Sequence, residues 1–235
     1  MIDSAGPGGG IPATTIGTAV ILCGGRSRRM GTDKARLVVG DQTLLERAVA
    51  VGDAVAPRVL LACGSEARYG DLGREQLLDR FPAGAAGAGA ARASAVDAAR
   101  TVHDRGGGPL AGLEAALTAA RSDWVAVLAC DMPGVEPPVF ERLLQSAVER
   151  ALDLCVLASD AGLEATCGVY HRRCLAAVRS ALEAGERKLT SFHDAVAAGS
   201  LHERELPGRG LSRNLNTISE LRAEVAGLRE QEASA

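Results

Sequence analysis

Aromatic residues and long apolar runs are scarce in this chain of 235 residues. Phe, Trp and Tyr together make up only 3% of it, which counts against the base-stacking surfaces of proteins that bind single-stranded nucleic acid. The formal net charge is -3, so no overall positive field favours nucleic acid either. No apolar run approaches the roughly 20 residues that a membrane-spanning helix needs. We therefore expect neither nucleic acid nor a membrane as a partner.

Paired cysteines are also missing, although the chain contains six cysteines. None of them forms a C-x-x-C pair, and the four histidines show no spacing typical of zinc ligands. We therefore predict neither a disulfide framework nor a zinc site, and expect several cysteines to pack as small apolar residues. Unpaired cysteines are typical of the cytosol, and the stretch MIDSAGPGGGIPATT lacks the basic and apolar regions of a secretory signal. The chain is thus predicted to be cytoplasmic, with a flexible leader over residues 1–15.

Short apolar runs alternate with helix-like stretches along the rest of the chain. The predicted strands cover residues 18–23, 58–63, 124–130, 152–158, 165–171 and 201–206. The predicted helices cover residues 44–55, 109–120, 137–152, 172–184, 190–198 and 217–231. Near-continuous apolar strands that alternate with helices indicate a mostly parallel sheet covered on both faces. The predicted fold class is therefore α/β, with a Rossmann-like, doubly wound sheet.

Residues 83–99 interrupt this alternation, because they are almost entirely alanine and glycine and offer little to bury. We interpret them as a surface insertion that is partly helical, and we assign no function to them. The length of the chain does not require a second core. We therefore predict a single domain over residues 16–235 that carries this insertion.

The stretch after the first predicted strand, CGGRSRRMGTDKARL (residues 23–37), combines glycines with positive charge. The absent side chains of Gly24 and Gly25 let backbone N–H groups approach a phosphate oxygen. The basic residues that can add charge are Arg26, Arg28, Arg29 and Lys34. In an open parallel sheet, ligands bind beyond the carboxyl ends of the strands. We interpret this loop as an anion site; the alternative is a tight turn followed by a solvated basic face.

Two familiar phosphate motifs are absent from this loop. Neither G-x-x-x-x-G-K-[ST] nor G-x-G-x-x-G occurs there, which excludes a P-loop kinase and a dinucleotide-binding turn.

A carboxylate, Asp131, ends the third predicted strand in VAVLACDMP (residues 125–133). Alone it would most often be a turn residue or a cap, but here it faces the same crevice as the glycine loop. Because carboxylates beside phosphates are natural Mg²⁺ ligands, we predict a Mg²⁺ site at Asp131.

Four segments resemble, in order, the signatures of the molybdenum cofactor guanylyltransferases. LCGGRSRRMGTDKARL (22–37) is similar to their L-x-G-G-x-S-x-R-M-G-x-D-K-x-x-L signature, and GGPLAGL (107–113) to their G-P-L-A-G-[ILM] segment. ACDMP (129–133) resembles their C-D-x-P metal site, and NLNT (214–217) their N-[IVL]-N-T segment. The resemblance runs from about residue 18 to 228. It implies a fold like that of the nucleotide-diphospho-sugar transferases, and an enzyme that joins GMP from GTP to the phosphate of molybdopterin.

The same resemblance implies a nucleotide site built largely from backbone. The groups that would hold the guanine nucleotide belong to Leu22, Cys23 and Gly24, with Gly25 beside them. The segment on the base side would be Pro109, Leu110, Ala111 and Gly112, where a helix N-terminus favours an anionic or polar ligand.

The resemblance also implies roles around the phosphates. Arg29 and Lys34 would neutralise the triphosphate, with Lys34 stabilising the charge of the leaving pyrophosphate. Asp131 would bind Mg²⁺, the implied cofactor. Asn214 and Asn216 match paired asparagines of the family, which we expect near the metal or the pterin phosphate; the alternative is that they only cap the last helix.

The chain departs from the family pattern at three places. Cys23 replaces the usual alanine, a small change with little expected consequence. The family's nucleotide-binding aspartate before G-P-L-A-G has two candidates, Asp104 and Asp79, of which we favour Asp104. The asparagine that many members carry after the second strand has no equivalent, because Gly64 and Ser65 stand there.

The sequence leaves other functions open. A related nucleotidyltransferase could use CTP or another phosphorylated acceptor such as a sugar phosphate. A non-catalytic module that binds or chaperones molybdenum cofactor is a second alternative, although the intact Lys34 and Asp131 weigh against it. Beyond GTP and molybdopterin, molybdoenzymes or their chaperones are candidate partners.

Overall fold

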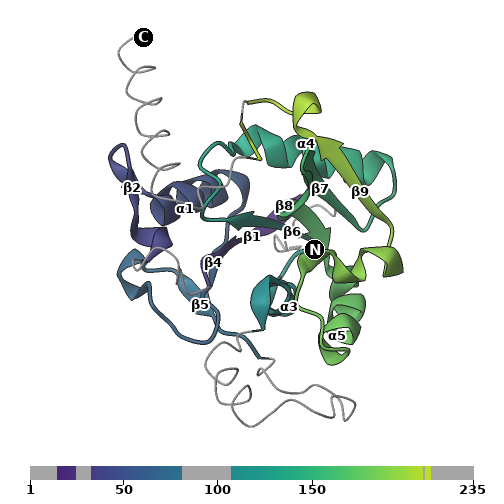
Figure 1. The fold of residues 1–235 in the computed structure, drawn as a ribbon, viewed down its shortest axis with the longest axis horizontal. Helices are drawn as coiled ribbons and strands as arrows, with labels where there is room; N and C mark the ends of the chain where they lie inside the picture. Colours follow the sequence, from purple (N-terminus) through teal and green to yellow (C-terminus); the bar gives the residue numbers. More distant parts are fainter. Residues whose placement is uncertain (1–14, 25–32, 81–106, 209, 213–235) are drawn as a thin grey trace, which may run out of the picture.

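A seven-stranded sheet forms the centre of the computed structural model, which describes residues 15–24, 33–80, 107–208 and 210–212. The strand order is β5-β4-β1-β6-β8-β7-β9, labelled in Figure 1. The strands are β1 (Ile16–Leu22), β4 (Val59–Ala62), β5 (Glu75–Leu77), β6 (Trp124–Ala129), β7 (Leu154–Ser159), β8 (Gly162–His171) and β9 (Ala198–His202). All neighbouring strands pair in parallel except β8, which is antiparallel to both β6 and β7. The predicted α/β class with a mostly parallel sheet is confirmed.

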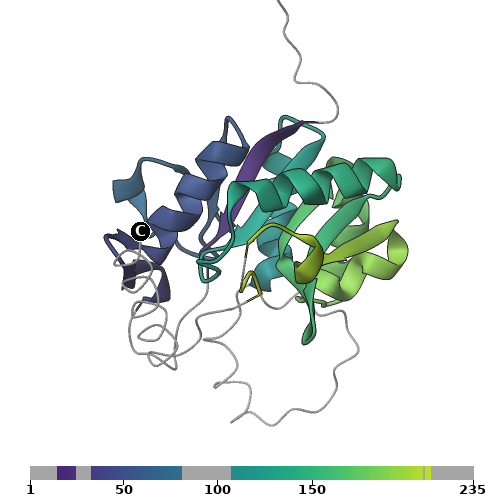
Figure 2. The ribbon, with the colours of Figure 1, turned by 90° about the horizontal axis from the view of Figure 1, so that it is seen from above.

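Helices cover both faces of this sheet. They are α1 (Leu44–Val55), α3 (Gly108–Ala119), α4 (Pro137–Glu149) and α5 (Leu175–Glu183). Helices α1 and α4 lie on one face, and α3 and α5 lie on the other (Figures 1 and 2). Among the helices of the described residues, none combines the length and apolar character that crossing a bilayer requires.

The side chains of β1 show why both faces must be covered. Ala19 and Ile21 belong to the buried cluster that includes Phe140 of α4. Val20, between them in sequence, belongs to the other buried cluster, together with Leu110 of α3. Because successive side chains of a strand point to opposite faces, a continuously apolar strand needs a helix layer on each side.

Short elements connect this framework. A small hairpin of β2 (Val38–Val39) and β3 (Gln42–Thr43) leads into α1, which begins with a capping box between Thr43 and Glu46. Short 3₁₀ segments are η1 (Lys34–Arg36), η2 (Gly70–Leu72), η3 (Arg172–Cys174), η4 (Leu189–Ala195) and η5 (Glu203–Glu205).

Two predictions of local structure were wrong, and one strand was missed. The strand predicted at 201–206 is β9 at Ala198–His202 followed by a turn, because pairing with β7 selects residues 198–202. The helix predicted at 190–198 is the 3₁₀ segment Leu189–Ala195, and the edge strand β5 was missed because it contains only one apolar residue. The predicted leader, insertion and last helix lie outside the described residues.

Candidate active site

The carboxyl ends of β1, β4, β5 and β6 meet at one edge of the sheet. Hydrogen bonds link each strand end to its neighbour. Gly24 N–H donates to the Ala62 carbonyl at 2.8 Å, and Asp79 N–H donates to the Gly64 carbonyl at 2.8 Å. Cys130 N–H donates to the Leu22 carbonyl at 3.2 Å. The residues predicted to bind a nucleotide after β1 and a metal after β6 therefore begin from backbone positions that are fixed relative to one another.

Gly24 occupies a position that leaves no space for a side chain. A Cβ atom there would lie 2.6 Å from the backbone nitrogen of Gly64, which cannot move without shifting β4. The N–H groups of Cys23 and Gly24 both donate to the Ala62 carbonyl. A nucleotide that used these two N–H groups would have to compete with hydrogen bonds inside the sheet. The end of β1 therefore offers a ligand a closely packed backbone surface, and these two N–H groups are not free donors.

Lys34 and Asp131 come together at this edge although 97 residues separate them in the sequence. The Lys34 Nζ donates to Asp131 Oδ2 at 2.6 Å. Their side chains are only 14% and 24% exposed, respectively. A charge-assisted contact that is partly shielded from water is stronger than one on an open surface. The structure therefore places the predicted phosphate lysine and the predicted metal ligand at one point; Gly25 and Arg29 lie outside the described residues.

Asp79, one of the two candidates for the nucleotide aspartate, lies beside the start of α3. Its Oδ2 accepts a hydrogen bond from Gly107 N–H at 2.9 Å. Burial raises the pKa of the Asp79 carboxyl, and the hydrogen bond from Gly107 opposes that shift. Asp79 thus joins the edge after β5 to the G-P-L-A-G segment. Asp104, the candidate favoured from sequence, lies outside the described residues.

The G-P-L-A-G segment forms the first turns of α3 and packs closely against the strand ends. Gly108 has a φ of +68°, and a Cβ on it would come within 3.0 Å of the Arg187 carbonyl oxygen. A Cβ atom added at Gly112 would lie 3.1 Å from Leu22 Cδ2, which is a tight contact. Pro109 is exposed, whereas Leu110 is fully buried and its N–H donates to the Arg187 carbonyl at 3.3 Å. Only the exposed first turn of α3 can therefore present side-chain surface to a ligand.

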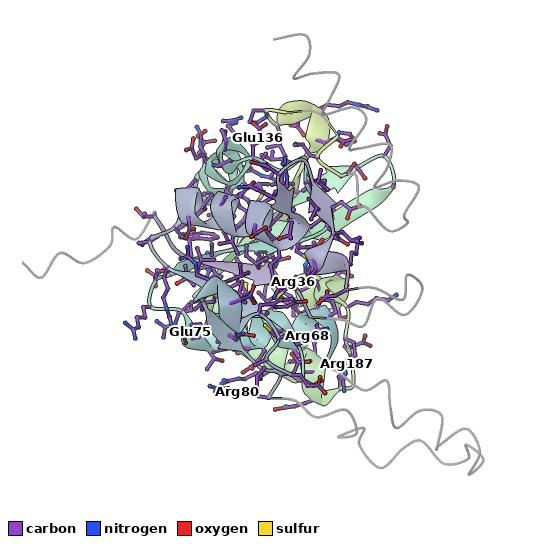
Figure 3. All side chains as sticks on the ribbon, turned by 90° about the vertical axis from the view of Figure 1, so that its left-hand side faces the viewer. Arg36, Arg68, Glu75, Arg80, Glu136 and Arg187 are labelled. Atoms are coloured by element: carbon purple, nitrogen blue, oxygen red, sulfur yellow. The ribbon has the colours of Figure 1, made fainter. Side chains whose placement is uncertain are left out.

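Two residues at this edge escaped the sequence reasoning, Tyr69 and Arg68. The Tyr69 hydroxyl lies 2.9 Å from Asp33 Oδ2 and 3.3 Å from the Cys23 carbonyl oxygen, which the Arg68 guanidinium also approaches at 3.3 Å. Figure 3 labels Arg68 in a view toward this side of the molecule. The available signal was the rarity of tyrosine, which occurs only twice in the chain.

The cysteines near the site are packing residues. All six cysteines are free and buried, as the sequence reasoning expected of several of them. Burial, and then the neighbouring Asp131, raise the pKa of the Cys130 thiol to about 12, so it stays protonated at neutral pH. Within the described part of the chain, no group of three or more potential metal-ligating side chains occurs.

The last predicted residues, Asn214 and Asn216, lie outside the described residues. The described residues combine a close glycine backbone, a lysine–aspartate pair and a half-buried aspartate beside the start of α3. Such an edge can hold a phosphorylated nucleotide with a divalent cation, because it offers both one carboxylate for the metal and positive charge for the phosphates.

Comparison with known proteins agrees with this geometry. A family described as the MobA-like NTP transferase domain matches residues 19–197. A Pelotomaculum thermopropionicum protein named "Probable molybdenum cofactor guanylyltransferase" is 30% identical over 210 residues, which cover 87% of this chain and 89% of that protein.

Solved structures show the same fold. Molybdopterin-guanine dinucleotide biosynthesis protein A from Archaeoglobus fulgidus superimposes with a TM-score of 0.67 at 20% identity, covering 91% of this chain and 99% of that one. The 2-C-methyl-D-erythritol 4-phosphate cytidylyltransferase of Thermus thermophilus superimposes with a TM-score of 0.58 at 19% identity, covering 89% and 98%. At these identities the likeness establishes the architecture alone.

Proposed function

The chain belongs to the MobA-like NTP transferase family, and from this premise we propose that it is a molybdenum cofactor guanylyltransferase. It transfers GMP from GTP to the phosphate of molybdopterin and releases pyrophosphate. The single observation that carries the proposal is the 2.6 Å contact between Lys34 and Asp131 beside the glycine end of β1. This contact brings a phosphate-binding cation and a metal-binding carboxylate to one point.

The Asp131 carboxylate fits a Mg²⁺ ion that is shared with the nucleotide. Mg²⁺ commonly takes one or two protein carboxylates and completes its coordination with water and substrate phosphates. Asp131 supplies one such carboxylate, which is 24% exposed and already lies against a cation, the ammonium of Lys34. Asp131 would hold the metal, which when bound would supply positive charge to offset the negative charge of the phosphates.

The chain's own residues act by positioning and by charge. An oxygen of the molybdopterin phosphate forms a bond to the α-phosphorus of GTP as the bond from that phosphorus to the bridging oxygen of pyrophosphate breaks. No covalent protein nucleophile takes part. Lys34, together with Arg29, neutralises the charge that moves onto the leaving pyrophosphate. Asn214 and Asn216 are assigned to the metal or pterin side.

The nucleotide is assigned to the end of β1, at Leu22, Cys23, Gly24 and Gly25, and to the start of α3, at Pro109, Leu110 and Gly112. Because the N–H groups of Cys23 and Gly24 already donate to the Ala62 carbonyl, and Leu110 and Gly112 are buried, the nucleotide would pack against the end of β1 and the exposed Pro109 rather than use free donors there. Asp79 is the better supported nucleotide aspartate, since it is half-buried and its carboxylate accepts from Gly107 N–H at 2.9 Å. For Asp104 to be the nucleotide-binding aspartate, as the sequence favoured, its carboxylate would have to lie beside the start of α3, where Asp79 lies. Substituting each by asparagine and measuring GTP affinity separates the two.

Two alternatives stand beside this proposal, of which a structural likeness favours the first and the site opposes the second. The cytidylyltransferase of the same fold shows that this architecture also serves CTP, so base choice rests on few contacts. A non-catalytic module that binds molybdenum cofactor would need neither Lys34 nor Asp131, and their close pairing speaks against it.

The test is a transfer assay with purified protein, Mg²⁺, molybdopterin and one nucleoside triphosphate at a time. We expect GMP transfer and pyrophosphate release with GTP, and none when EDTA removes the metal. Preferential CMP transfer would overturn the choice of GTP. Tight binding of molybdopterin without turnover of any nucleotide would favour the non-catalytic module.

A further inference from the structure

Tyr69 is a fully buried aromatic residue at the edge of the site, with 0% of its surface exposed. Its loop is held from β5, because the Oε1 atom of Gln76 accepts from the backbone N–H groups of Arg68 at 2.8 Å and Tyr69 at 3.2 Å. The guanidinium carbons of Arg36 and Arg68 lie 5.1 and 5.4 Å from the centre of its ring. Both arginines are labelled in Figure 3. Cation–π contacts of this kind fix the ring, and so determine where its hydroxyl points.

The hydroxyl of Tyr69 joins two parts of the site that are distant in sequence. It lies 2.9 and 3.1 Å from the two carboxylate oxygens of Asp33, and 3.3 Å from the carbonyl oxygen of Cys23. Burial, and then the hydrogen bond to Asp33, raise the pKa of the Tyr69 phenol well above its ordinary value. The phenol therefore keeps its proton and donates it to the Asp33 carboxylate.

Asp33 in turn starts the 3₁₀ turn that carries Lys34. Its Oδ1 accepts from the N–H of Ala35 at 3.1 Å, which caps the turn Lys34–Arg36. Because a lysine side chain has many rotamers, the reach of its ammonium depends on where its backbone begins. From this turn the Lys34 Nζ meets Asp131 at 2.6 Å.

We propose that Tyr69 is a positioning residue of the transfer reaction, whose hydroxyl holds the Asp33 carboxylate and thereby the turn that directs Lys34 to Asp131. The neighbouring Arg68 links the same loop to the end of β1, because its guanidinium donates to the Cys23 carbonyl at 3.3 Å. The inference rests on the proposed function for the reaction that it serves. It does not depend on which base or acceptor the enzyme uses, since none of its contacts involves them.

Substituting Tyr69→Phe tests the hydroxyl alone, because the ring and its two arginine contacts remain. A displacement of a catalytic group by about 1 Å can cost up to about a hundredfold in rate. We expect kcat for GMP transfer to fall about tenfold to a hundredfold, with the KM for GTP changing by less than about threefold. Lys34 acts mainly on charge that develops as pyrophosphate leaves, and so the loss falls on kcat.

The matched control is Tyr170→Phe, which removes the same atom from the only other tyrosine of the chain. Tyr170 is equally buried, on β8, and its hydroxyl donates to the Ala165 carbonyl at 2.5 Å. We expect this variant to lose stability but to keep the kcat of the wild type. An equal loss of kcat in both variants would assign Tyr69 a merely structural role.

A double-substitution cycle asks whether Tyr69 works through Lys34. In the Lys34→Ala background, Tyr69→Phe should cost no further activity, because the group that it positions is already absent. Two losses that multiply would show that Tyr69 acts by another route, and would overturn the inference.

A measurement without substrate makes the test independent of activity. The chain has two lysines, Lys34 and the exposed Lys188, so acylation of Lys34 can be quantified by mass spectrometry against an internal reference. One net hydrogen bond corresponds to a factor of about three to ten. We expect Tyr69→Phe to raise the ratio of Lys34 to Lys188 labelling by about that factor, and Tyr170→Phe to leave it unchanged.

The outcomes separate the two proposals. If the wild type transfers GMP but Tyr69→Phe matches it in kcat and in labelling, the inference is wrong and the proposed function stands. If the wild type transfers no nucleotide, the proposed function is wrong. The labelling ratio then still decides the inference: a rise in Tyr69→Phe supports the positioning of Lys34, and an unchanged ratio refutes it.

Discussion

Two aspartates of this protein come after apolar parallel strands at the same edge of one sheet, yet they differ in almost every other respect. Asp131 comes after β6, and its side chain is 24% exposed and paired with Lys34. Asp160 comes directly after β7, is 73% exposed, and pairs with His202 and Arg204. Exposed pairs of the second kind contribute little to stability. An aspartate at the end of a strand is therefore not a site by itself.

The two aspartates differ because the chain takes a different path after each strand. After β6 the chain leaves the sheet toward α4, and a turn from 97 residues earlier in the sequence can approach Asp131. After β7 the chain turns straight back into the antiparallel β8, so the end of β7 is closed by its own hairpin. The lesson is that convergence of distant segments, and not strand-end position, distinguishes the candidate catalytic aspartate from a surface one.

The largest difference between the two aspartates should appear when the carboxylates of Asp131 and Asp160 are removed in two separate variants. We expect Asp131→Ala to lower Mg²⁺-dependent GMP transfer by about a thousandfold or more, because the metal would lose the carboxylate that we assign to hold it. Asp160→Ala should stay within about twofold of the wild type, since its partners lie on the surface. Single-turnover kinetics at saturating Mg²⁺ measure both. Unchanged turnover in Asp131→Ala would refute the metal role.

Gly24 and Gly168 allow a second comparison, between the half of the sheet that forms the site and the half that contains β8. A Cβ at Gly24 would lie 2.6 Å from Gly64 N, and one at Gly168 would lie 2.7 Å from Val156 Cγ1 and 3.0 Å from the Cys155 carbonyl oxygen. Overpacking of this kind costs about 1–3 kcal/mol, so both alanine variants should lose free energy of unfolding.

Only Gly24→Ala should also lose nucleotide affinity, by about tenfold or more, because it separates the ends of β1 and β4. Denaturant unfolding and calorimetric titration with Mg²⁺ and GTP test this pair. Gly70→Ala is a mild control, since its Cβ would meet nothing closer than Gln76 Nε2 at 3.9 Å. Equal loss of affinity in Gly24→Ala and Gly168→Ala would show that the two halves do not differ in this way.

The smallest expected effect concerns pH and belongs to the half that contains β8. His193 is buried, its Nε2 has no hydrogen-bond partner among the described residues, and burial lowers its pKa. Below its ordinary pKa of about 6.5, the unfolded chain binds the proton more readily than the folded one. This contribution to stability is complete above that pH, and it is lost as the pH falls toward the lowered folded-state pKa.

Urea unfolding at about pH 7.5 and about pH 5.5 should therefore show a smaller acid loss in His193→Phe than in the wild type. Burial also lowers the pKa of His171, so this residue should account for part of the acid loss of stability that remains in His193→Phe. If His193→Phe retained the full acid loss of the wild type, His193 would not be its source.

Much of this protein was predictable from local patterns. Continuous apolar runs such as that of β1, each followed by a helical pattern, indicated the parallel sheet, and the basic glycine loop together with Asp131 indicated the site. The edge strands β5 and β9 were missed or displaced because their few apolar side chains leave no periodic signal. The strand β8 was predicted as a strand, but its antiparallel direction depends on the hairpin with β7 and on pairing with β6.

The sequence by itself determined the class of fold, the family, and the lysine and carboxylate to which phosphate and metal binding are assigned, because these depend on residue type and spacing along the chain. Only the tertiary structure decided which distant groups meet. It paired Lys34 with Asp131, set Asp79 against Gly107, and placed the Tyr69 hydroxyl on Asp33. Such contacts join segments that are far apart in the chain, and their geometry depends on the packing of the whole sheet and its helices.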